Sequence, residues 1–98
     1  MNFENANLKN VDFTDSDLRY ANFTNANLTG SFLNFAKLKG ANLTNAILDS
    51  VKVDRADWLI QLKKLNVVGA DNIYENYKVD SVHYYSFSKT KKPMLLKR

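Results

Sequence analysis

Residues 21–30 read ANFTNANLTG, and the same five-residue pattern returns as ANLTN at residues 41–45. In each unit a small residue is followed by a polar one, a large apolar one and two more polar ones. The large apolar position recurs at every fifth residue along the first sixty residues of the chain. Its members are Phe3, Leu8, Phe13, Leu18, Phe23, Leu28, Leu33, Leu38, Leu43, Leu48, Val53 and Trp58.

A period of five fits neither a helix nor a flat strand. Five residues advance an α-helix by about 500°, so the large residues would scatter around its axis. A straight strand would send alternate large residues to opposite faces. A chain that turns a corner after every fifth residue keeps all of them inside. Four such sides close a coil of about twenty residues, and successive coils stack at the strand spacing of about 4.8 Å.

This pattern resembles that of a known family. The runs Ala21-Asn22-Phe23, Ala26-Asn27-Leu28 and Ala41-Asn42-Leu43 are similar to the A(D/N)LXX signature of the pentapeptide-repeat proteins. The resemblance implies an all-β solenoid, a right-handed quadrilateral β-helix, over residues 1–57. The twelve units correspond to about three coils. The resemblance implies little about function.

Residues twenty positions apart should lie above one another in such a column. The fourth side is therefore expected to stack Leu18, Leu38 and Trp58 in the interior. The outward asparagines, such as Asn22 and Asn42, are interpreted as hydrogen-bonding residues at the corners.

The five-residue period ends after Trp58, and residues 58–98 form a second unit. Apolar residues at positions 58, 62 and 65 predict one helix, and Gly69 separates it from a second helix over residues 70–77. Residues 79–87 predict a strand, residues 89–93 a turn, and residues 94–96 a short return strand. We expect the helices to cap the last coil, with Trp58 as its plug, because an open β-helix end exposes apolar side chains and strand edges.

The first coil has no such cap in the sequence, so four apolar residues are expected to face outward there: Phe3, Leu8, Phe13 and Leu18. Residues 82–96 could fold back over this end, two chains could meet there, or the chain could be part of something longer. We favour self-association as a homodimer, because an exposed apolar end is typical of an interface.

The sequence offers little for catalysis or metal binding. It has no cysteine and a single histidine, His83, and Ser16 and Ser31 fall in the inward small column. The acidic group at residues 12, 15 and 17 lacks the ligand spacing of a calcium loop. We therefore expect a protein that is not an enzyme and has no cofactor and no metal.

Charge and hydropathy limit the kinds of partner and the location that the sequence favours. Residues 1–60 carry six basic and seven acidic side chains, whereas residues 61–98 carry eight basic and three acidic ones. The short basic runs near the C-terminus are interpreted as solvated surface, with binding to nucleic acid or an acidic membrane surface as the alternative. No apolar run approaches the roughly 20 residues of a membrane span, and no secretory signal is recognisable, so a cytoplasmic location is expected.

Two phenylalanines depart from the repeat. Phe32 and Phe35 occupy outward positions where the other units are polar, and Tyr20 is expected at a nearby corner. An exposed aromatic pair with charged neighbours is typical of a partner-binding site. Alternatively, the aromatic residues of the tail pack over this pair: Tyr84, Tyr85 and Phe87.

The leading hypothesis is a non-enzymatic protein–protein interaction or scaffolding module that displays side chains on a rigid column. The partner itself is unknown. The family resemblance implies a second possibility, a DNA mimic that protects a topoisomerase, but such columns are long and strongly acidic, and this one is short and nearly neutral. A third possibility is an accessory domain of a larger protein.

Overall fold

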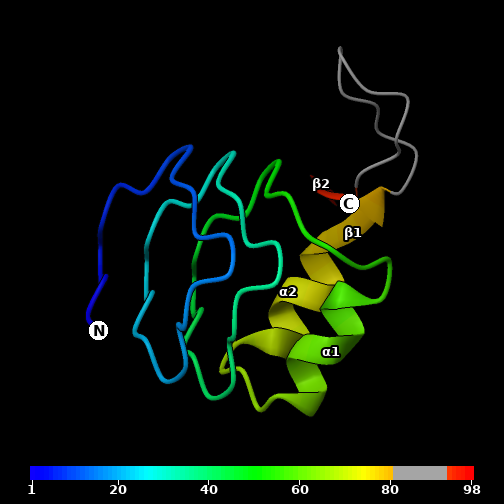
Figure 1. Ribbon diagram of the computed structural model, residues 1–98. Helices are drawn as coiled ribbons and strands as arrows, with labels where there is room; N and C mark the ends of the chain where they lie inside the picture. The colour runs from blue at the N-terminus through cyan, green and yellow to red at the C-terminus, as the bar shows by residue number, and fades with distance from the viewer. Residues whose placement is uncertain (81–92) are drawn as a thin grey trace.

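The computed structural model describes residues 1–80 and 93–98. The chain winds through stacked coils from the N-terminus and then enters two helices at the other end of the column (Figure 1). The elements are α1 (Trp58–Lys64), α2 (Ala70–Asn76), β1 (Tyr77–Asp80) and β2 (Met94–Lys97). We call residues 1–20 coil 1, residues 21–40 coil 2 and residues 41–57 coil 3. Each five-residue segment is one side of a coil.

Coils are joined by parallel backbone pairing between residues twenty apart. Asn22 pairs with both Asn2 and Asn42, and Phe32 pairs with both Asp12 and Lys52. On the first side, for example, the Asn22 N–H donates to the Met1 carbonyl at 2.9 Å. The spacing of twenty residues matches four sides of five, as the sequence predicts.

The corners are made by residues in the left-handed backbone region. Every fifth residue from Asn5 to Ser50 has φ between 58° and 72°. Most of these residues are Asn or Gly, and the exceptions are Asp15, Tyr20, Phe35 and Ser50. Glycine and asparagine tolerate this region best, which explains the composition of the fifth position. The second position closes the turn locally, since Asn22 Oδ1 accepts from the Thr24 N–H at 3.0 Å and from its hydroxyl at 2.6 Å.

The large apolar column fills the interior. Phe23, Leu28 and Leu48 are fully buried, and the ring of Phe23 stacks on that of Phe3 with centroids 4.9 Å apart. Burying one such side chain contributes roughly 1.5–3 kcal/mol. Ser31 lies in the small column with its hydroxyl buried and without a hydrogen-bond partner among the described residues.

The N-terminal coil differs from expectation. Phe13 is 9% exposed and Leu18 only 2%, so the prediction that both face outward is wrong; Phe3 and Leu8 are half-buried. The reason is that the rings close the narrow coil themselves, with Phe3 edge-on to Phe13 at 5.8 Å. Self-association through this end stays a prediction.

The alternative that residues 82–96 fold back over coil 1 is wrong for residues 94–96. Strand β2 lies at the opposite end, where Leu95 donates its N–H to the Val51 carbonyl at 2.8 Å, and it pairs antiparallel with β1. The predicted strand over residues 79–87 begins earlier, at Tyr77, because α2 ends at Asn76. Residues 81–92, which include the predicted turn and Tyr84, Tyr85 and Phe87, lie outside the described part.

The fourth side of coil 3 is absent as a strand. Lys37 pairs with Asp17, but no residue of coil 3 pairs with Lys37 in turn. Trp58 is buried, as expected of a plug, and it lies in the first turn of α1 instead of on a strand-like side of the column. The apolar pair Leu59-Ile60 stands where the repeat has polar residues, and this favours an amphipathic helix over another corner.

The interior column can be tested by truncation. We expect Leu28→Ala to lower the free energy of unfolding by about 2–5 kcal/mol, because the truncation leaves a cavity in the closed interior. The control Ile47→Ala removes an apolar side chain that is 43% exposed on the same side of the column, and it should cost less than about 1 kcal/mol. Urea unfolding followed by circular dichroism measures both. Equal costs would contradict the closed interior.

Candidate functional site

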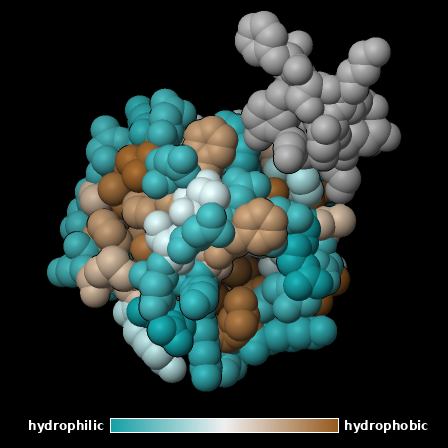
Figure 2. All heavy atoms as spheres, viewed as in Figure 1, coloured by the Kyte–Doolittle hydropathy of each residue, from teal (hydrophilic) through white to brown (hydrophobic). Residues whose placement is uncertain are grey.

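A groove lies between the fourth side of coil 2 and helix α1. Its volume is about 410 Å³, and the space-filling view shows a hollow with apolar side chains inside and polar ones around it (Figure 2). The apolar lining is made by Phe35, Ala36, Leu38, Trp58, Leu62 and Leu65. The polar lining is made by Arg19, Lys37, Lys39, Asp54, Arg55 and Gln61.

The groove exists because the C-terminal end of the column is closed on three sides only. On the first side, Val68 takes the place of a next coil: its N–H donates to the Ala41 carbonyl, and its carbonyl accepts from Leu43, both at 2.9 Å. The third side is covered by β2. On the fourth side, coil 3 gives way to α1, and the groove lies between this helix and coil 2.

The second side is closed by a side chain. The Leu48 N–H donates to the Tyr77 hydroxyl oxygen at 3.0 Å, and that hydroxyl donates to Asp49 Oδ1 at 2.7 Å. Burial raises the pKa of Tyr77, so the phenol keeps its proton and remains a donor at neutral pH. Tyr77 thus replaces one backbone carbonyl of a missing coil.

The groove has a positive rim. Arg19 is bound to Asp17 at 2.7 Å and Arg55 to Asp57 at 2.7 Å, whereas Lys37 forms no ion pair within the described part of the chain. Lys39, also on the rim, likewise has no such partner among residues 1–80 and 93–98. These two ammonium groups are therefore available to an acidic ligand.

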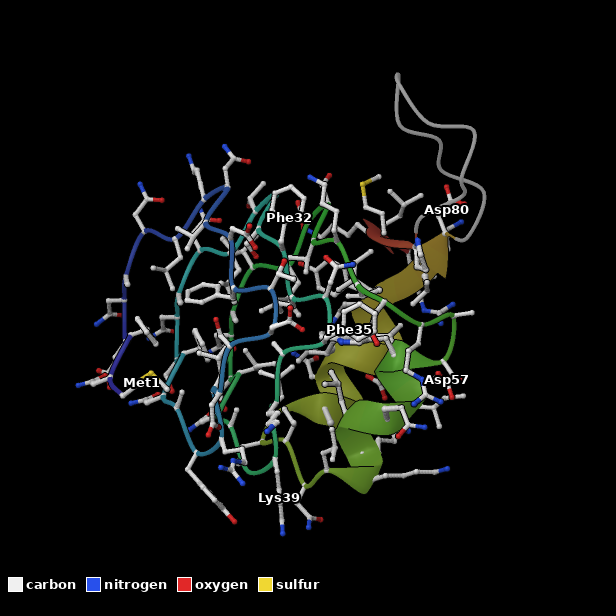
Figure 3. The ribbon with its side chains drawn as sticks, in the orientation of Figure 1. Met1, Phe32, Phe35, Lys39, Asp57 and Asp80 are labelled. Atoms are coloured by element: carbon white, nitrogen blue, oxygen red, sulfur yellow. The ribbon has the colours of Figure 1, made fainter. Side chains whose placement is uncertain are left out.

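The three predicted partner-binding aromatics do not form one patch. Phe35 is 66% exposed and lies at the mouth of the groove, between the coils and α1 (Figure 3). Tyr20 is 69% exposed but lies at the next corner, with its ring against Gly40. Phe32 is half-buried, and the ammonium of Lys52 lies 5.0 Å from its ring centroid.

The described part of the chain has neither a metal-ligand group nor a membrane-spanning helix. Among residues 1–80 and 93–98, no three His, Asp or Glu side chains come together as metal ligands would. Within the same ranges, the helices are too short and too polar to cross a membrane.

Sequence reasoning missed the groove and found only Phe35 at its mouth. The unit Ala56-Asp57-Trp58 keeps the small–polar–large order, so the pattern predicts a fourth side where the chain instead enters α1. The one available signal is the following pair, Leu59-Ile60, which breaks the polar rule. Nothing in the sequence indicates that Val68 or Tyr77 would complete the end of the column.

The fold and the repeat define a four-sided solenoid, and comparison with known proteins agrees. The model of the pentapeptide repeats matches residues 2–34 and 33–57 with eight copies, which is more than half of the chain. The chain belongs to the pentapeptide-repeat family, whose fold is a right-handed quadrilateral β-helix.

The chain is also similar to a protein of known structure. A crystallised pentapeptide repeat protein from Nostoc Pcc 7120 is 30% identical, over 68% of this chain and 78% of that chain, with a TM-score of 0.24. No curated protein sequence is significantly similar to the chain.

The contact of Tyr20 with Gly40 predicts a coupled effect. A Cβ at residue 40, where φ is 69°, would be strained and would strike the Tyr20 ring. Gly40→Ala should therefore lower the free energy of unfolding by about 1–2 kcal/mol from backbone strain, and by more while the ring is present. Urea unfolding should show a smaller cost in a Tyr20→Ala background. Equal costs in both backgrounds would contradict the contact.

The Arg19–Asp17 pair predicts an acid titration. Hydrogen bonds from the Arg19 side chain and backbone lower the pKa of Asp17 from 3.8 to about 2, with a smaller contribution from the charge of Lys37. A lowered pKa in the folded state stabilises the fold above the ordinary pKa, and this contribution is lost as the pH falls from about 4 to 2. Carboxyl NMR should show this pKa, and Arg19→Gln should raise it. An ordinary pKa in the unaltered protein would show that Arg19 is free.

Proposed function

We propose that this chain is a non-enzymatic protein-interaction module that binds a partner protein at the groove between coil 2 and α1. The observation that carries the proposal is the position of Phe35. Its ring is 66% exposed at the mouth of an apolar groove, in a column where the corner position otherwise favours Asn or Gly. A large aromatic side chain held in water beside an apolar groove is typical of a binding hot spot.

The backbone around Phe35 supports this proposal because it is held in place. The Phe35 N–H donates to Asp54 Oδ1 at 3.2 Å, and the carbonyl of the preceding Asn34 accepts from the Asp15 N–H of coil 1 at 3.0 Å. A side chain displayed from a rigid backbone loses little conformational freedom on binding. Non-enzymatic interaction proteins are also common in the family to which the chain belongs.

The charge of the groove argues against the DNA-mimic alternative. A surface that replaces DNA must present negative charge, because proteins bind DNA largely through its phosphates. The rim of this groove carries Lys37 and Lys39 without an ion-pair partner in the described ranges. We therefore do not propose that role.

The proposal predicts that partner binding depends on Phe35. We expect Phe35→Ala to weaken partner binding by at least about thirtyfold, which corresponds to roughly 2 kcal/mol for a hot spot. The control Ile47→Ala removes an exposed apolar side chain outside the groove and should leave binding unchanged. Affinity capture from an extract of the source cells identifies the partner, and titration calorimetry then measures each variant.

Circular dichroism serves as the folding control, and the spectrum of Phe35→Ala should match that of the unaltered chain. Tyr20→Ala, at the neighbouring corner, should have a smaller effect because Tyr20 does not line the groove. If Phe35→Ala binds every captured protein with unchanged affinity, the proposal is wrong.

A further inference from the structure

We propose that the open edge of coil 2 at Ala36–Leu38 binds an extended acidic segment of the partner protein as one added β-rung. This inference rests on the proposed function and names the kind of partner that the groove takes. It follows from three features of the groove: unpaired backbone groups, a vacant position in the repeat, and a positive rim.

The first feature is a pair of backbone groups on either side of Lys37 that are unpaired within the described part of the chain. Lys37 uses both of its own groups toward coil 1, because its N–H donates to the Ser16 carbonyl at 2.9 Å and its carbonyl accepts from Leu18 at 2.8 Å. Backbone groups alternate in direction along an extended strand. The Ala36 carbonyl and the Leu38 N–H therefore point the other way, toward α1. Among residues 1–80 and 93–98, neither group has a hydrogen-bond partner.

The first side of coil 2 shows which hydrogen bonds the fourth side lacks. On the first side, Asn42 of coil 3 donates to the Ala21 carbonyl at 2.9 Å and accepts from the Phe23 N–H at 2.7 Å. One incoming residue thus satisfies both groups of the edge. On the fourth side, the corresponding groups are the Ala36 carbonyl and the Leu38 N–H. An extended peptide running parallel to the edge can supply the same two hydrogen bonds, as in β-augmentation.

The backbone of this edge is fixed in an extended conformation that a ligand strand can join. The Gly40 N–H donates to the carbonyl of Leu65, the residue that follows α1, at 2.9 Å, and this bond anchors one end of the side. At the other end, the side begins at Phe35, where the groove opens to solvent. Between these two ends the unpaired groups of Ala36 and Leu38 keep a fixed spacing. Unpaired strand edges of this kind pair readily with another chain.

The rim indicates which side chain the added residue carries. It would lie outside Lys37 in the same outward stack in which Lys37 lies above Asp17. Lys37 has no ion pair within the described residues, so an acidic side chain fits this position and a basic one does not. The residues before and after it would turn inward, toward the apolar side chains of Leu62 and Leu65.

The chain itself contains this order of residues. Ala56-Asp57-Trp58 reads small–acidic–large, the unit that a complete coil 3 would place on Lys37. In the structure Asp57 instead receives hydrogen bonds from Arg55 at 2.7 Å and Gln61 at 3.2 Å, as the chain enters α1. The position is therefore vacant for a segment of another protein. Residues 81–92 contain no acidic side chain and do not have the required charge.

The test uses the full chain, labelled with ¹⁵N, and a synthetic peptide, acetyl-Gly-Ala-Asp-Leu-Gly-amide. We expect the amide resonance of Leu38 to move on titration and its hydrogen exchange to slow, because it gains an acceptor. Two control peptides carry either a methyl group on the aspartate backbone nitrogen or lysine in place of aspartate. Both should bind more weakly, since the first cannot donate to Ala36 and the second is repelled by Lys37.

A pair of matched variants tests the charge. Lys37→Gln should weaken binding of the aspartate peptide by about two- to fivefold, as expected for one exposed ion pair, and should not weaken the lysine peptide. Lys9→Gln removes the same charge from an exposed position on coil 1 and should change neither. An unmoved Leu38 amide at about 1 mM peptide, or equal binding of the N-methylated peptide, overturns the inference.

The failures of the two proposals are distinguishable. If Phe35→Ala abolishes partner binding while the peptide leaves the Leu38 amide unchanged, the interaction function stands and the added rung is wrong. If the peptide protects Leu38 while Phe35→Ala retains every partner, the rung stands as a peptide site and the proposed function is wrong.

Discussion

Backbone hydrogen bonding between coils is the constraint on which the rest of the structure depends. Each coil presents a ring of N–H and C=O groups along the column axis, and every buried group needs a partner. The repeat satisfies this requirement by placing an identical coil twenty residues later. Where the repeat stops, Val68, Tyr77 and β2 complete three sides by three different means. The end of this column is therefore assembled from unrelated parts.

The same constraint explains why the groove lies where it does. Helix α1 begins at Trp58, so its backbone bonds run within the helix and cannot continue the fourth side. Its apolar residues, including Leu62, still pack over the interior. The helix thus covers the hydrophobic end of the β-solenoid without pairing with the strand edge of the fourth side. The apolar floor of the groove and its free backbone groups have this single origin.

The corners decide which side chains are displayed. A left-handed residue turns the chain and projects its side chain outward, and for residues other than Gly, Asn or Asp this conformation costs about 1–2 kcal/mol. Phe35 and Tyr20 both occupy such positions. Tyr20 recovers a contact with Gly40, whereas the Phe35 ring stays mostly in water. An unfavourable conformation combined with solvent exposure is the reason why we propose Phe35 as a binding residue.

The sequence by itself determined the coils, because a large residue at every fifth position, such as Leu28 and Leu33, has one common interior only if the chain turns at each unit. It also determined the two helices and marked Phe35 as an exception. Only the tertiary structure decided that Leu18 is buried at the first coil and that Val68 and Tyr77 close the last one. It also decided that the edge at Leu38 has no partner among residues 1–80 and 93–98. These features depend on contacts between segments far apart in the chain, and a local repeat carries no information about which distant group completes its final hydrogen bonds.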